Sequence, residues 1–169
     1  GFVPANTLIA IHRPAQMMLR IPDRVKLEAE LRKVREKHFT ARTLKSKAKC
    51  REDDKRLRAE IADLLRTDGW DDTTAKQLAA WDPYDQNASA PFFDSEWMFG
   101  LTDGFDIVIG NPPWGIPFTP AEKKDLKANY VVARGIIDSF ALFIERGDKL
   151  LTARGILAMI LPDIVLLKA

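Results

Sequence analysis

Four consecutive residues in the C-terminal half, Asn111-Pro112-Pro113-Trp114, combine groups that could hold and orient an amine. The side-chain oxygen of Asn111 and the backbone carbonyl of Pro112 both accept hydrogen bonds, and Pro112 has no N–H of its own to compete. Two acceptors can bind one amino group and orient its lone pair towards an electrophile. This is catalysis by positioning and electrostatics, without a strong base. Trp114 adds a flat face on which an aromatic base can stack. The segment therefore predicts a site for a planar base that carries an exocyclic amine.

The sequence around this segment gives it a defined position. The two prolines fix their φ angles and favour an extended geometry at Asn111, so the segment is stiff. It directly follows residues 105–109, an apolar, β-branched run without alternation, which predicts a strand of a parallel sheet buried on both faces. Ligands of open α/β sheets bind beyond the carboxyl ends of strands, and the segment lies at such an end.

Further elements of an α/β fold are expected on both sides. Thr119-Pro120-Ala121-Glu122 has the pattern of a helix start with a capping box. A longer helix is expected over about residues 138–151, and a second buried strand over 156–161, ended by Pro162. A short apolar run at residues 2–8 predicts another strand, and the aromatic residues between 92 and 99 are expected to pack in a core.

A charged helical region separates the first of these strands from the others. The apolar spacing predicts one helix from Asp23, a second over about residues 40–65 and a short third from Asp71 to about Ala80, the first two forming a hairpin. Residues 23–67 hold fifteen Lys and Arg against nine Asp and Glu, and residues 37–51 hold six basic residues and no acid. Lys45, Lys47 and Lys49 are therefore candidate contacts to a polyanion, with a merely solvated charged arm as the alternative.

Composition excludes several classes of protein. The net charge is +2, and the single cysteine, Cys50, which lies in the basic stretch and is expected to be exposed, excludes an intrachain disulfide and a thiolate metal site. His12 and His38 have no partner motif, so no metal site is expected. No apolar run is long enough to cross a membrane, and we expect a cytoplasmic protein. The missing initial Met and the apolar C-terminus lead us to expect a piece of a larger chain.

The run from Phe105 to Trp114 resembles the catalytic motif of amino-directed, S-adenosylmethionine-dependent DNA methyltransferases in their adenine-specific form. Residues 2–9, the helical insertion and residues 94–110 also resemble the methyltransferases of type IIG restriction-modification systems. The resemblance implies that Asn111 and Pro112 hold the target amine, that Pro113 completes the motif and that Trp114 stacks on the flipped adenine. It implies Asn6 as a contact near the adenine of the cofactor.

This resemblance implies a partial Rossmann-like class I methyltransferase fold with an inserted basic helical hairpin. Residues 1–20 and 81–169 would belong to the methyltransferase core, and residues 21–80 would form the insertion. The implied cofactor is S-adenosylmethionine and the implied partner is double-stranded DNA. The glycine-rich cofactor loop of the family lies upstream and its target-recognition domain downstream, so we expect this chain alone to be inactive and to bind the cofactor weakly or not at all.

Two other functions remain open. Protein-glutamine and RNA-guanine methyltransferases resemble the chain through loops with Asn-Pro-Pro-aromatic sequences, although the basic insertion favours DNA. The chain could instead be a non-catalytic nucleic-acid-binding module built around the hairpin.

Overall fold

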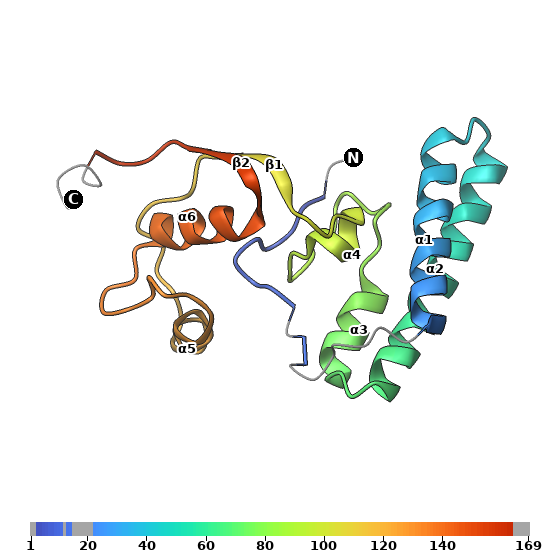
Figure 1. The fold of residues 1–169 in the computed structure, drawn as a ribbon, viewed down its shortest axis with the longest axis horizontal. Helices are drawn as coiled ribbons and strands as arrows, with labels where there is room; N and C mark the ends of the chain where they lie inside the picture. The colour runs from blue at the N-terminus through green and yellow to red at the C-terminus, as the bar shows by residue number, and fades with distance from the viewer. Residues whose placement is uncertain (1–2, 12, 15–21, 164–169) are drawn as a thin grey trace. The chain divides into compact units, whose positions relative to one another are not determined.

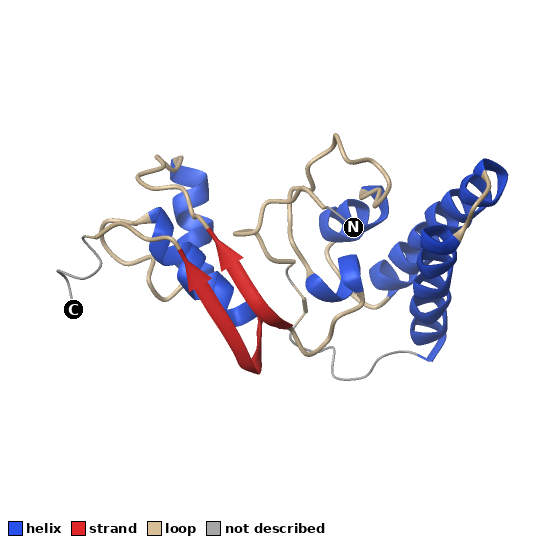
Figure 2. Cartoon of the chain, turned by 90° about the horizontal axis from the view of Figure 1, so that it is seen from above, coloured by secondary structure: helices blue, strands red, loops and turns tan. Residues whose placement is uncertain are grey.

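The computed structural model describes residues 3–11, 13–14 and 22–163, and the chain divides into two compact units, residues 1–100 and 101–169. Each unit has its own secondary structure (Figures 1 and 2). Among the described residues, no helix is both long and apolar enough to cross a membrane. His12 lies outside the described residues.

The first unit is helical, with α1 (Pro22–Thr40), α2 (Leu44–Thr67), α3 (Asp72–Ala80) and the short α4 (Ser95–Phe99). The helices α1 and α2 lie side by side and form the expected hairpin (Figures 1 and 2). Thr43 begins α2 by accepting a hydrogen bond from the backbone N–H of Ser46, and Asp71 begins α3 in the same way through Thr74. These caps satisfy N–H groups that the first turn of a helix leaves free.

The core of the first unit lies where these helices meet the segment that follows them. Leu57 and Ile61 of α2 are fully buried, and Phe92 and Met98 are buried in the same cluster. Phe93 and Trp97 pack against this cluster, so the expected packing of the aromatic residues is confirmed except at Phe99, which is 42% exposed. Cys50 is also buried, at 3% exposed, and our expectation of an exposed thiol is wrong. Cys50, Leu57 and Ile61 recur at helical spacing, which places the thiol on the buried face of α2.

The strand expected at residues 2–8 is not formed over the described residues. Only an isolated parallel bridge joins Ala5 to Ala90, flanked by hydrogen bonds from Ala90 N to Pro4 O and from Asn6 N to Ala90 O. Asn6 then bends the chain, because its side-chain oxygen accepts a hydrogen bond from Leu8 N. The apolar pattern of this run is therefore satisfied by packing against the core, without a ladder.

The second unit is an α/β element made of β1 (Phe105–Gly110), α5 (Pro120–Asn129), α6 (Ser139–Leu150) and β2 (Leu151–Met159). The strands are parallel neighbours, with Ile107 opposite Ile156 and Gly110 opposite Met159. The capping box of α5 is confirmed, since Thr119 and Glu122 exchange both hydrogen bonds. The strand β2 begins five residues earlier than expected, directly after α6, and the register shifts between Phe105 and Ile107.

One face of this small sheet is covered and the other is open. A side-chain carbon at Gly147 of α6 would lie 2.6 Å from Leu157 Cδ1, so helix and strand are in close contact on that side. On the opposite face Ile109 is 75% exposed, and Ile107 and Ile156 are exposed as well. The prediction of strands buried on both faces is therefore wrong for the described residues. An apolar run indicates that a strand can be buried, but it does not show that another element of the same chain covers each face.

Candidate active site

The loop Asn111–Trp114 leaves directly from the carboxyl end of β1. The last strand residue, Gly110, accepts a hydrogen bond of 3.0 Å from Ile160 N, just beyond β2. The backbone is therefore well fixed where Asn111 begins.

A second contact fixes the middle of the loop. The hydroxyl of Ser139 donates a hydrogen bond of 2.6 Å to the carbonyl oxygen of Pro113, and the Ser139 side chain is completely buried at the start of α6. Pro112 is buried as well. Sequence reasoning missed Ser139, because nothing in the sequence around it indicates a contact with Pro113. The loop is therefore attached both to the strand and to the helix that covers the sheet.

Two of the residues predicted to hold a ligand, Asn111 and Trp114, remain accessible. Asn111 is exposed and Trp114 is 54% exposed, while Gly115, with φ of 63°, turns the chain after the ring. No hydrogen bond within the described part of the chain uses the Asn111 side chain or the Pro112 carbonyl. A shallow apolar depression lies beside them at the strand ends, lined by Ile109, Gly110, Ala158, Met159 and Ile160. The unit thus presents the Asn111 amide and the Trp114 ring, and the Pro112 carbonyl has no hydrogen-bond partner among the described residues.

The helix α6 also organises the chain that follows α5. Glu145 of α6 accepts hydrogen bonds from the backbone N–H groups of Val131 and Val132 and from Lys149 Nζ. Burial acts to raise the pKa of Glu145, but Lys149 and the two N–H groups outweigh it, so the pKa lies below its ordinary value. Since Ser139 and Glu145 lie on one helix, α6 fixes both the candidate loop and the segment after α5.

The remaining predicted site residues belong to the first unit. Asn6 is exposed, and its side-chain oxygen accepts the hydrogen bond from Leu8 N in the local turn. Lys45 and Lys49 are exposed and Lys47 is half-buried, all near the first turn of α2. The structure therefore brings Asn111, Pro112, Pro113 and Trp114 together in one unit, whereas Asn6 and the three lysines lie in the other.

The end of the α1–α2 hairpin is both cationic and apolar. Phe39 and Leu44 are 83% and 88% exposed there. Burial lowers the pKa of His38, and the neighbouring charges of Arg51 and Lys47 lower it further. The electrostatic environment of His38 is therefore positive.

Residues 17–168 match the Eco57I restriction-modification methylase family, and the chain belongs to this family. Over 70 residues it is 40% identical to a predicted type II restriction enzyme and methyltransferase of Methanocaldococcus jannaschii. That match covers 41% of this chain and 6% of the relative, so the chain matches a small part of the relative's length. No solved structure matches the chain.

Proposed function

We propose that this chain is the part of an adenine-specific DNA methyltransferase that holds the target base. The observation that carries the proposal is the Asn111–Trp114 loop, which is attached through Gly110 and Ser139 while the Asn111 side chain and the Pro112 carbonyl have no hydrogen-bond partner among the described residues. Membership of the Eco57I restriction-modification methylase family supports the reaction class and duplex DNA as the substrate. We place the second unit in a larger Rossmann-like sheet, of which β1 and β2 are two neighbouring parallel strands.

The loop would act by positioning the base. An adenine rotated out of the duplex would stack on Trp114, and its amino group would donate one hydrogen bond to the Asn111 side-chain oxygen and one to the Pro112 carbonyl. Both N–H bonds then point away from the face of attack, and the nitrogen lone pair is withdrawn from conjugation with the ring. Because the loop is stiff and already attached, this orientation requires little rearrangement when the base arrives.

The described residues offer more candidate contacts to the methyl acceptor, adenine, than to the methyl donor. S-adenosylmethionine, the donor we propose, supplies an electrophilic methyl group when bound, and the methylated amine releases one proton. Within the described residues only Asn6 is a candidate contact to it, and the glycine-rich loop and acidic residue of the resembling enzymes have no counterpart in this sequence. We therefore assign cofactor binding mainly to the rest of the parent protein, and target recognition likewise.

The cationic end of the hairpin supports DNA as the partner. Lys45, Lys47 and Lys49 would neutralise phosphates, which adds affinity without sequence specificity. Protein-glutamine or RNA-guanine methyl transfer would use the same loop with another acceptor, and a non-catalytic nucleic-acid-binding module would use the hairpin alone. The domain assignment of residues 1–20, 21–80 and 81–169 stays part of this proposal.

The test is methyl transfer by the full-length parent protein on unmethylated duplex DNA, followed by digestion to nucleosides and mass spectrometry. We expect methyladenine from the parent protein and none from Asn111→Ala. Asn87→Ala is the matched control, because Asn87 is an exposed asparagine in a turn of the other unit. Methylation of protein or RNA with unmodified DNA would show that the acceptor is wrong. Methyladenine formed by Asn111→Ala at the normal rate would refute the role of the loop.

A further inference from the structure

The end of the α1–α2 hairpin carries two large apolar side chains that the rest of the first unit does not cover. Phe39 lies in the last turn of α1 and is 83% exposed, and Leu44, the first residue of α2, is 88% exposed. Figure 1 shows the turn between the two helices at the top of the hairpin, whereas α2 runs on to α3 at the opposite end. Single exposed apolar residues are common on protein surfaces, but two of this size beside one turn form a candidate contact surface.

The same end of the hairpin is cationic. Residues 37–49, which we call the hairpin end, contain five basic residues and no acidic one, and the nearest acids along the chain are Glu36 and Glu52. Among the described residues, the ion pairs of the hairpin do not include any of the five, which are Lys37, Arg42, Lys45, Lys47 and Lys49. Four of these side chains are exposed, and Lys47 is half-buried.

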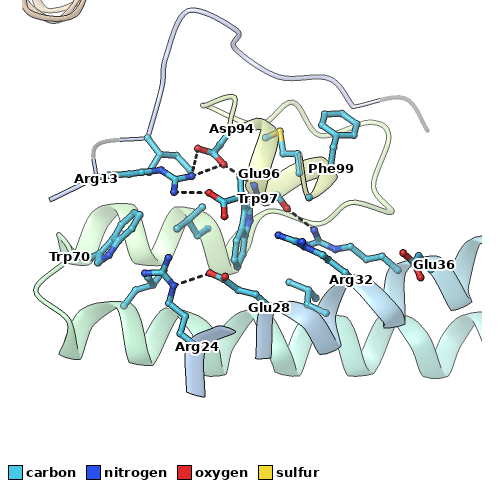
Figure 3. Close-up of a pocket in the computed structure, with 17 residues that line it drawn as sticks. Arg13, Arg24, Glu28, Arg32, Glu36, Trp70, Asp94, Glu96, Trp97 and Phe99 are labelled. Carbon is cyan, nitrogen blue, oxygen red and sulfur yellow. Dashed lines mark hydrogen bonds and ion pairs between the residues drawn. The ribbon is translucent and has the colours of Figure 1, made fainter. Parts of the chain in front are cut away.

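Several arginines of the first unit, by contrast, are paired with carboxylates. Around the pocket that α1 and α4 help to line, Arg24 pairs with Glu28 and Arg13 pairs with Asp94, each at 2.8 Å (Figure 3). The fully buried Asp54 of α2 is paired with two arginines. The positive charge of the hairpin end has no comparable partner within the described residues, so it is available to an anion of another molecule.

The position of these charges works against the stability of α2. Lys45 and Lys47 lie in its first turn, which contains no acidic residue. The N-terminus of a helix carries the positive end of the helix dipole, so cations in this turn are unfavourable. Solubility alone does not require cations at this place, whereas a bound polyanion would remove the repulsion.

The turn holds both apolar residues in fixed positions. The hydroxyl oxygen of Thr43 caps α2 by accepting a hydrogen bond of 3.1 Å from Ser46 N. Thr40 Oγ1 contacts two backbone carbonyls of α1, each at 3.2 Å. Phe39 and Leu44 therefore belong to closed helical turns on either side of a short connection, and a preorganised surface loses less entropy on binding.

We propose that the hairpin end docks on duplex DNA, with its cations at the phosphates and with Phe39 and Leu44 against the bases. The proposal rests on the proposed function, which supplies duplex DNA as the partner, and it adds a contact that phosphate neutralisation does not provide. Proteins that kink duplex DNA insert apolar side chains such as Phe and Leu between base steps, next to Arg and Lys. The hairpin end combines these two chemistries at one turn.

Binding of the full-length parent protein to a short DNA duplex and to heparin, a polyanion without bases, tests the proposal. Phe39→Ala is expected to weaken duplex binding by ~5-fold or more, because a base contact of an aromatic side chain is lost. Leu44→Ala should cause a smaller loss. In both variants heparin binding and the slope of log K against log salt should stay unchanged, because no phosphate contact is removed.

Two controls accompany these variants. Val25→Ala removes another exposed apolar side chain of α1, far along the helix from the turn, and should leave duplex binding unchanged. Replacing Lys45, Lys47 and Lys49 by Gln should weaken binding to DNA and to heparin alike, because it removes charge. Since Phe39 and Leu44 are more than four-fifths exposed, their replacement should leave the fold intact.

Methyladenine formation by the same proteins separates this proposal from the proposed function. A parent protein that methylates DNA, with unchanged duplex affinity in both Phe39→Ala and Leu44→Ala, would overturn the docking and leave the proposed function intact. Equal losses of heparin and duplex affinity in these variants would also overturn the base contact. A changed oligomeric state or a lower melting temperature without a change in DNA affinity would show that the two side chains contact a second copy or another part of the parent protein. A parent protein that neither binds nor methylates duplex DNA would refute both proposals.

Discussion

The hydrogen bond from Ser139 to Pro113 gives the most direct test of how the candidate loop is held. Ser139→Ala removes a buried donor and leaves the Pro113 carbonyl without its 2.6 Å partner. The expected loss of stability is ~1 to 3 kcal/mol, the range for a buried polar group that loses its partner. If this energy orients the loop in the transition state, the same amount appears as a decrease of ~5-fold to 150-fold in kcat.

The assay measures kcat and KM for methyl transfer by the full-length parent protein, together with thermal stability. Ser139 acts through the loop and not on the base itself, so we expect kcat to fall more than KM rises, and Ser139→Thr to restore part of the rate because it keeps the hydroxyl. Thr119→Ala is the matched control, because it removes the cap of α5 in the same unit at a cost of ~1 kcal/mol. A similar loss of stability in both variants with normal kcat in Ser139→Ala would refute the positioning role.

Two further predictions concern the hairpin. Replacing Lys45, Lys47 and Lys49 by Gln is expected to weaken DNA binding and to lower the slope of log K against log salt by up to ~2.7. The control replaces Lys26, Lys33 and Lys55 by Gln, and we expect a smaller effect on both quantities. Equal effects of the two sets would show that the hairpin is only a solvated arm. The folded-state pKa of His38 lies below its ordinary 6.5, so its contribution to stability is present above that pH and is lost as the pH falls through the folded pKa. The melting temperature should therefore decrease less from pH ~7 to ~5 in His38→Gln than in the unchanged chain, and identical pH profiles would contradict this.

Local patterns predicted the elements that depend on neighbouring residues in the sequence. The capping box at Thr119, the start of the short helix at Asp71 and the helical spacing of the hairpin are short-range features, and each is confirmed. We expected β2 to start at residue 156, but it starts at Leu151, because no connecting residues separate it from the end of α6 at Leu150. The first residues of β2 pair irregularly with β1, so they lack a regular strand pattern in the sequence.

Features that depend on residues far apart in the sequence could not be predicted from local patterns. Ser139 meets Pro113 across 26 positions, and nothing in either local sequence specifies that contact. The loop Asn111–Trp114 was recognisable because its chemistry lies in consecutive residues.

The open face of the sheet affects how the second unit should respond to heat and denaturant. Ile107, Ile109 and Ile156 are largely exposed to water already in the folded chain, so unfolding adds little new apolar surface from them. Both the heat-capacity increment of unfolding and the denaturant m-value scale with newly exposed surface. The second unit should therefore unfold with a smaller heat-capacity increment per residue than a unit of equal length with both sheet faces covered, and its stability should vary less steeply with denaturant concentration.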